Sequence, residues 1–170
     1  MTLPQDRDYI GVDHGVEELL KQGITPRFAI GDFDSLQNRK SLEDLNIQIL
    51  PERKDVTDTH AAIEYAISKG YDEIEIYGAT GGRLDHFFAV MCLLEKYQDI
   101  KLKVIDQQNC IQLLKPGKHY IYNQGYYYFS LFALNESIIS IDQAEYTLDR
   151  YLLKREDPLC VSNEVKSEYA

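Results

Sequence analysis

Apolar and polar residues alternate in short blocks over the first 105 residues, and these blocks predict strands and helices in turn. Short apolar runs typical of strands occur at residues 9–12, 27–30, 47–50, 73–77 and 102–105. Helical spacing occurs at residues 16–22, 37–45 and 59–69, and again from Leu84 through Phe87, Phe88, Met91 and Leu94. Alternating β and α units of this length predict an α/β fold: a mainly parallel, Rossmann-like sheet with flanking helices.

The pattern changes after residue 106. Short β-type runs at 111–114, 120–122, 126–134, 138–141 and 146–153 are separated by turn signals at 115–118 and 123–125, and no convincing helix appears. We therefore expect two domains, an α/β domain over residues 1–106 and a small all-β, sandwich-like domain over 107–170. Tyr120, Tyr122, Tyr126, Tyr127 and Tyr128 suit strands of that second domain, and an aromatic-ligand pocket is the less favoured interpretation of this cluster.

Charge separates the two parts. The chain has a net charge of −10, and residues 1–100 hold 19 acidic and 10 basic residues. An acidic surface argues against a nucleic-acid partner, although it allows a nucleotide whose phosphates are held through a metal ion. Three scattered cysteines predict reduced thiols in a cytoplasmic protein. With no signal peptide and no apolar run of membrane-spanning length, we expect no membrane association.

The first candidate motif is Gly31-Asp32-Phe33-Asp34-Ser35. If the chain stays extended here, Asp32 and Asp34 point to one side, as a shared metal ion would require. Open α/β sheets bind ligands at the carboxyl ends of their strands, which is where the motif falls. A plain turn with two aspartates is the alternative, and the neighbouring Ser35, a possible phosphate donor, favours the functional interpretation.

The second motif is Lys54-Asp55-Val56-Thr57-Asp58. Thr57 or Asp58 is expected to cap the following helix, and a helix N-terminus also favours bound anions. Asp55 lies outside the cap, which makes it the better candidate for a metal ligand or a base. Lys54 is the expected partner of phosphate oxygens, although a solvated lysine is the simpler interpretation.

The third motif, Gly81-Gly82-Arg83-Leu84-Asp85-His86, is the most specific. Two glycines let the backbone approach a ligand, and Arg83 then meets that ligand at a helix start. Asp85 could be only an acid favoured by the helix dipole, and His86 is treated as secondary. Crowded carboxylates repel one another unless a hard cation such as Mg²⁺ lies between them, so the three motifs together indicate metal-assisted phosphoryl chemistry.

The ordered set resembles thiamine pyrophosphokinase (thiamine diphosphokinase) of the bacterial type. The resemblance covers about residues 9–164 and is carried by the three motifs, by Val12-Asp13-His14-Gly15, by Gly23-Ile24-Thr25-Pro26 and by Ser162-Asn163-Glu164. It implies transfer of a pyrophosphoryl group from ATP to the hydroxyl of thiamine, giving thiamine diphosphate and AMP with Mg²⁺ as cofactor. It also implies a homodimer, with thiamine bound between the α/β domain of one subunit and the β domain of the other.

The same resemblance implies roles for individual residues. The residues expected around the metal and the reacting phosphates are Asp32, Asp34 and Asp55, with Lys54 and Arg83 beside them. The expected nucleotide-, phosphate- or thiamine-binding positions are Asp13, Ser35, Thr57, Asp58, Arg83, Asp85, Ser162 and Asn163. The resemblance leads us to expect two further elements that residues 1–170 do not contain: a first strand with a glycine-rich loop before residue 9, and a last strand after Glu164. His14 replaces the family's frequent glycine or arginine and is given no role.

Other functions use the same residues. A related diphosphokinase could act on a pterin alcohol, with the β domain binding a different heterocycle. A metal-dependent phosphohydrolase would use the aspartates to activate water. A nucleotide sensor would bind ATP with Mg²⁺ and show no turnover.

Overall fold

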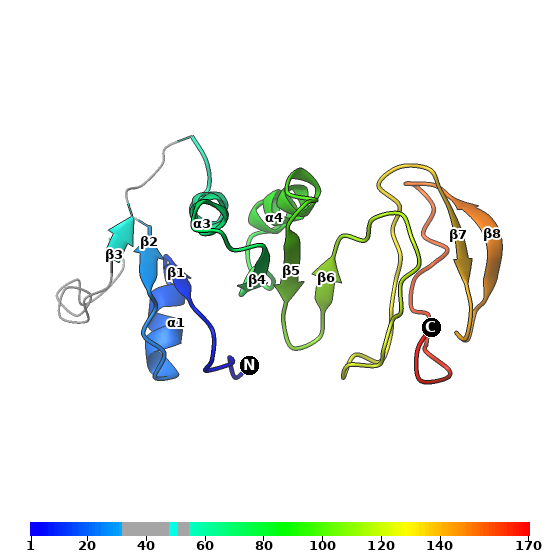
Figure 1. Ribbon diagram of the computed structural model, residues 1–170, viewed down its shortest axis with the longest axis horizontal. Coiled ribbons are helices and arrows are strands. Elements are labelled where there is room, and N and C mark those ends of the chain that lie inside the picture. The colour runs from blue at the N-terminus through cyan, green and yellow to red at the C-terminus, as the bar shows by residue number, and fades with distance from the viewer. Residues whose placement is uncertain (32–47, 51–54) are drawn as a thin grey trace. The chain divides into compact units, whose positions relative to one another are not determined.

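The computed structural model describes residues 1–31, 48–50 and 55–170, and within them a mixed α/β protein with three helices and several small sheets (Figure 1). The chain forms two compact units, Met1–Leu113 and Leu114–Ala170. The helix predicted at residues 37–45 lies outside the described residues. In the parts of the chain that the structure describes, no helix is both long and apolar enough to cross a membrane.

The first sheet contains three short parallel strands in the order β1 (Ile10–Val12), β2 (Phe28–Ile30) and β3 (Gln48–Leu50). Val12 is paired with Ile30, and Ile30 with Leu50, so the three carboxyl ends lie in register at one edge. Helices α1 (Gly15–Lys21) and α3 (Asp58–Ser68) confirm the predicted helices, and Ala61 and Ala62 of α3 pack against Ile30. The parallel arrangement expected for these strands is confirmed.

The second sheet has the order β4 (Glu73–Tyr77), β5 (Lys101–Ile105) and β6 (Cys110–Gln112). Strands β4 and β5 are parallel, as predicted, and helix α4 (Leu84–Lys96) connects them. The buried core of this region joins α3, α4 and β5 through Ile63, Val90, Leu93, Leu94, Leu102 and Val104. The described strands of the first unit therefore form two small sheets.

Helix α4 buries only part of the apolar face that its spacing predicted. Leu84 and Phe88 are 71% and 64% exposed, while Val90, Leu93 and Leu94 are buried. The later turns of the helix meet Leu102 and Val104 of β5, so core burial is concentrated there. The first turn keeps large apolar side chains at the surface.

Strand β6 belongs to the first compact unit of the chain. The sequence placed the start of the second domain near residue 107, but β6 pairs antiparallel with β5, with Val104 opposite Ile111. This pairing ties residues 110–112 to the first unit, which extends to Leu113. A hairpin signal after a parallel strand is ambiguous in sequence, because the hairpin can close one sheet or open the next.

A single carboxylate organises the turn between β5 and β6. Oδ1 of Asp106 accepts hydrogen bonds from the backbone N–H groups of Gln108 and Asn109, each at 2.7 Å. Oδ2 accepts from the hydroxyl of Thr80 at 2.7 Å, and the side-chain amide of Asn109 also donates to Asp106. These donors, the Thr80 hydroxyl first, lower the pKa of Asp106 to about 2.

The second unit is built around the antiparallel pair β7 (Ser137–Ile141) and β8 (Leu148–Leu153). Its buried core is small and contains Ala133, Ile141, Ala144, Leu153 and Cys160. Residues 114–170, all described, contain no helix, as the sequence predicted.

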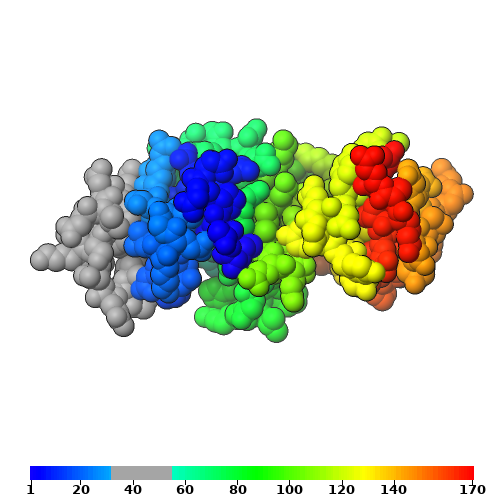
Figure 2. Space-filling model, turned by 90° about the horizontal axis from the view of Figure 1, so that it is seen from below, coloured from blue at the N-terminus to red at the C-terminus, as the bar shows by residue number. Residues whose placement is uncertain are grey.

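The prediction of strands at 120–122 and 126–134 is wrong. These segments make single bridges, Tyr122 to Tyr169 and Phe129 to Asn163. Tyrosine-rich segments favour extended backbone, but a strand also needs a partner that stays in register over several residues. Figure 2 shows the C-terminal residues beside those near residue 120, where the backbones of Ile121 and Ala170 exchange two hydrogen bonds.

Asn163 holds three segments of the second unit together. It is 3% exposed, and its backbone exchanges two hydrogen bonds with Phe129. Its side-chain oxygen accepts from the N–H groups of Tyr146 and Glu164, and its amide donates to the carbonyl of Tyr146 at 2.8 Å. One buried amide therefore joins residues near 129, 146 and 164.

We expect Asn163→Ala to lower the free energy of unfolding by about 1–3 kcal/mol, because it leaves polar groups of Tyr146 and Glu164 without their partner. Urea denaturation followed by tyrosine fluorescence measures the loss. Ser162→Ala is the matched control, since Ser162 is exposed and the change should stay within about 0.5 kcal/mol. An Asn163→Ala protein as stable as the control would contradict the bracing role.

The lowered pKa of Asp106 predicts a pH-dependent contribution to stability. Folding lowers this pKa from 3.8 to about 2, so the stabilisation is complete above about pH 4 and is lost as the pH falls towards 2. Urea midpoints of wild type and Asp106→Asn should differ most at neutral pH, and the difference should narrow as the pH falls through this window. A difference that is independent of pH would show that the ionised carboxylate is not the stabilising group.

Candidate functional site

The carboxyl edge of β1–β2–β3 brings Asp13 beside Gly31. Asp13 directly follows β1, and its backbone N–H donates to the carbonyl of Ile30 at 2.9 Å. A Cβ placed on Gly31 would lie 2.2 Å from Oδ1 of Asp13, and Gly31 has a φ of +144°. Glycine is therefore required at position 31 for steric and conformational reasons. The Asp13 carboxylate thus lies at the residue that leads into the Asp32–Asp34 motif.

Four predicted site residues fall outside the described residues: Asp32, Asp34, Ser35 and Lys54. The described residues on either side of them are informative. Gly31 follows β2, residue 50 ends β3, and Asp55 opens the turn before α3. The first and second motifs are therefore reached from the carboxyl ends of neighbouring parallel strands, where open α/β sheets bind ligands.

Thr57 is the N-cap of α3. Its hydroxyl accepts from the backbone N–H of His60 at 3.2 Å, and Asp58 occupies the first turn of the helix. The sequence left the cap open between Thr57 and Asp58, and the structure assigns it to Thr57. Asp55 is exposed and lies outside the helix, as predicted.

Arg83 and Asp85 form a two-pronged ion pair at the start of α4. Nε of Arg83 donates to Oδ1 of Asp85 at 3.1 Å, and Nη2 donates to Oδ2 at 2.6 Å. The bonds from Arg83 lower the pKa of Asp85, and the Asp85 carboxylate raises that of Arg83. Both side chains are more than half exposed, so the pair adds little to stability. Its effect is to orient the guanidinium, and these bonds leave the Nη1 group for another acceptor.

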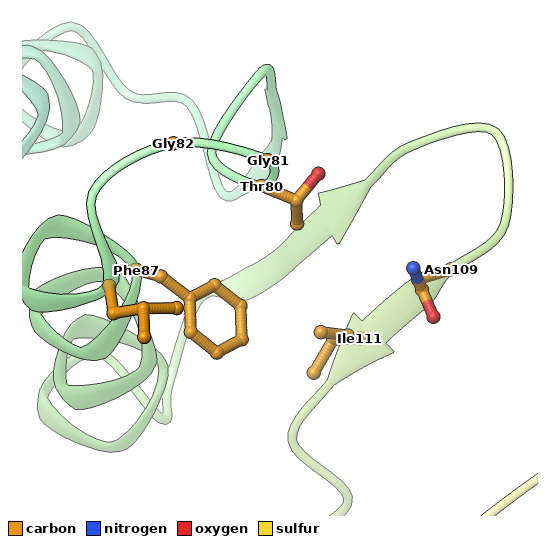
Figure 3. A pocket seen from close by; sticks show the side chains of 7 residues that line it. Thr80, Gly81, Gly82, Phe87, Asn109 and Ile111 are labelled. Atoms are coloured by element: carbon orange, nitrogen blue, oxygen red, sulfur yellow. The ribbon is translucent and has the colours of Figure 1, made fainter.

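A pocket of about 250 Å³ lies between the β4–α4 loop and the β5–β6 turn. Figure 3 shows Phe87 and Ile111 facing its interior, Thr80 on the loop and Asn109 at the start of β6. The full lining is Thr80, Gly81, Gly82, Leu84, Phe87, Asn109 and Ile111. Gly81 and Gly82, which the sequence predicts to let the backbone approach a ligand, are among these lining residues.

Sequence reasoning missed Thr80, Asp106 and Asn109. The signal that could have found the last two is the spacing Asp106-Gln107-Gln108-Asn109 directly after a strand, which is typical of a turn closed by an aspartate side chain. No sequence signal linked that turn to Thr80, because the two are joined only in the folded chain.

In the second unit, the two residues predicted to face thiamine differ in burial. Ser162 is exposed, has a φ of +60°, and receives support through its N–H, which donates to the hydroxyl of Ser130 at 3.0 Å. Asn163 is buried, and its side chain bonds to Tyr146 and Glu164. Ser162 can meet a ligand directly, whereas Asn163 fixes the backbone that presents it.

The predicted metal site lies only partly within the described residues. Among residues 1–31 and 55–170, no three His, Cys, Asp or Glu side chains come close enough to hold a metal ion. Asp13, at the carboxyl edge of β1 and against the backbone that leads to Asp32, supplies the oxygen donor that Mg²⁺ prefers. Asp13 thus provides one oxygen ligand at this edge, and the predicted metal ligands Asp32 and Asp34 lie outside the described residues.

His14 and His86 contact residues close to them in the sequence. His14, the N-cap residue of α1, is exposed and lies 3.2 Å from Glu17 and 3.5 Å from Glu18. His86 is exposed in the first turn of α4, where its backbone N–H donates to Asp85. Neither contact indicates a catalytic role.

Comparison with known proteins gives one consistent result. Residues 3–105 match the catalytic domain of thiamin pyrophosphokinase, and residues 118–170 match the vitamin B1 binding domain of thiamin pyrophosphokinase. Thiamine pyrophosphokinase of Bacillus subtilis (strain 168) is 37% identical over 166 residues, which cover 92% of this chain and 78% of that protein.

Two solved structures agree with this sequence match. The crystal structure of thiamine pyrophosphokinase from Bacillus subtilis superimposes with a TM-score of 0.90 at 34% identity, covering 98% of this chain and 82% of that one. The enzyme from Geobacillus thermodenitrificans gives 0.87 at 32% identity, covering 98% and 81%. Two domain matches in order, a relative above 30% identity and the same fold over nearly the whole chain lead to one conclusion: this chain belongs to the thiamin pyrophosphokinase family.

Proposed function

We propose that this protein is a thiamine diphosphokinase, which transfers a pyrophosphoryl group from ATP to thiamine. The hydroxyl oxygen of thiamine attacks the β-phosphorus of ATP, the bond between that phosphorus and the α–β bridging oxygen breaks, and AMP leaves. The products are thiamine diphosphate and AMP. The observation that carries the proposal is that both domains match this family in order. Asp13 follows β1, Asp55 lies in the turn before α3, and Arg83 is the N-cap residue of α4.

The first unit is proposed to hold ATP. Asp13, Asp32, Asp34 and Asp55 form the carboxylate set, and bound Mg²⁺ would neutralise charge on the phosphate oxygens. Arg83 and Lys54 grip the phosphates, and the Asp85 carboxylate holds the guanidinium in one orientation. Asp55, exposed and outside the helix, is our candidate for the group that accepts the proton of the attacking hydroxyl.

The remaining proposed binding positions support these groups. Ser35, Thr57 and Asp58 lie on the motifs around the carboxylate set, and the capped N-terminus of α3 favours phosphate. Ser162 contacts thiamine, and Asn163 fixes the backbone that presents Ser162. We also propose a Rossmann-like arrangement for the ATP-binding domain, a sandwich-like arrangement for the thiamine-binding domain, and a cytoplasmic location without nucleic-acid or membrane partners.

Mass spectrometry of the products tests the function. Incubation with ATP, Mg²⁺ and thiamine should give thiamine diphosphate and AMP, and EDTA should abolish both products until Mg²⁺ is restored. ADP with thiamine monophosphate would overturn pyrophosphoryl transfer. Turnover of a pterin alcohol in place of thiamine would favour the related diphosphokinase, and phosphate release without an acceptor would favour a phosphohydrolase.

Arg83→Lys should lower kcat by about 100-fold although the charge is kept, because misplacing a group that positions the phosphates slows the reaction by about that factor. An ammonium cannot bind Asp85 through two parallel bonds and also present a planar edge to phosphate. Steady-state kinetics of Arg83→Lys and Arg83→Ala measure this, with the exposed Arg155→Lys as the matched control. If lysine recovers most of the activity lost in Arg83→Ala, the geometric role is wrong.

We further propose a homodimer formed mainly through the second unit. Tyr127, Tyr128 and Phe132 there are 67%, 56% and 67% exposed, and aromatic residues are enriched in interfaces. Light scattering should report twice the chain mass, and activity should fall together with dimer mass on dilution. A fully active monomer would contradict both the dimer and a thiamine site shared between subunits.

A further inference from the structure

The β4–α4 loop is joined to the β5–β6 turn by one side-chain hydrogen bond. The hydroxyl of Thr80 donates to Oδ2 of Asp106 at 2.7 Å. Thr80 immediately precedes Gly81 and Gly82, and Arg83 follows as the N-cap residue of α4. The residue that Asp106 binds, Thr80, therefore lies three positions before Arg83, whose guanidinium we assign to phosphate.

The loop needs such a tether. Gly78 and Gly81 have positive φ angles of 76° and 82°, and a Cβ added at either, or at Gly82, would meet no atom within 4 Å. Packing around these three backbone positions is therefore open. Glycine also leaves the backbone the widest choice of conformations, so a fixed loop requires contacts from its other side chains.

The turn that holds Asp106 is itself well fixed. Besides the donors from Gln108 and Asn109 already described, the backbone N–H of Asp106 donates to the carbonyl of Asn109 at 2.9 Å. The turn belongs to a strand pair whose core residues, Leu102 and Val104, are buried against α4. Asp106 thus connects the glycine-rich β4–α4 loop to a well-fixed part of the same unit.

We propose that Asp106 is a positioning residue for the transfer reaction: through Thr80 it fixes the Gly81-Gly82-Arg83 loop, so that Arg83 meets the ATP phosphates in one place. This inference rests on the proposed function. Asp106 itself does not act as a metal ligand or a base, because its two oxygens already accept hydrogen bonds from Thr80, Gln108 and Asn109.

The low pKa of Asp106 agrees with this role. Since the pKa is about 2, the group remains an ionised acceptor at neutral pH and binds Thr80 through a charge-assisted hydrogen bond. Thr80 and Asn109 both donate to this carboxylate, and both line the pocket.

Thr80→Val and Thr80→Ser are the matched test pair. Valine keeps the shape but removes the donor, whereas serine keeps the hydroxyl. We expect Thr80→Val to lower kcat by about 10- to 100-fold, as expected for a misplaced phosphate grip, and Thr80→Ser to stay near wild type. Thr147→Val, an exposed threonine in the second unit, is the control for the substitution itself. Thermal melts establish that each variant is folded at the assay temperature.

A double-mutant cycle distinguishes positioning from general destabilisation. If Thr80 acts through Arg83, then adding Thr80→Val to Arg83→Ala lowers kcat by less than about twofold, because the two changes remove the same interaction. Multiplicative losses in the double variant would overturn the proposal, as would a Thr80→Val enzyme with wild-type kcat. Asp106→Asn and Asp106→Ala should repeat the non-multiplicative result.

Failure of the proposed function gives a different result. In that case the wild-type protein forms no thiamine diphosphate, and the cycle has no activity to compare. If wild type is active and Arg83→Ala is impaired, but Thr80→Val and Thr80→Ser are equally active, the function stands and the positioning role of Asp106 is wrong.

Discussion

The contact between the Asp13 carboxylate and the Gly31 backbone is the constraint on which the site depends. Three parallel strands end in register, and at that edge a carboxylate oxygen occupies the space that any side chain at position 31 would need. The positive φ of Gly31 then directs the chain out of β2. Both features act on the residue before the Asp32–Asp34 motif. The sheet edge thereby fixes the residue from which the Asp32–Asp34 motif starts.

The elements with strong periodicity could be predicted from sequence, and those that depend on pairing could not. The helix near residues 59–69 and the strands around it follow from local spacing, while the choice of Thr57 over Asp58 as its cap is made by the structure. The division after residue 113 does not follow from local spacing. It depends on the pairing of β6 with β5, which forms only in the folded chain. The same reason explains why segments 120–122 and 126–134 make bridges instead of strands.

The candidate site shows the same division. Arg83 and Asp85 could be identified from a motif, and their ion pair is local, two residues apart. Thr80 and Asp106 could not, because a hydrogen bond between residues so far apart in sequence leaves no local pattern. The apolar spacing of α4 even pointed the wrong way for Leu84 and Phe88, which are exposed although they continue the stripe.

The pairing pattern of the second unit also determines the order in which the chain can fold. Its earlier segments are joined to its latest ones: residue 121 to 170, residue 122 to 169 and residue 129 to 163. Such non-local contacts are slow to form, because loop closure must precede any gain from pairing. During synthesis the first unit has its strands and helices available early, while the tyrosine-rich segment waits for the residues around Asn163. In that interval the unpaired aromatic segment is the part of the chain most exposed to association with other chains.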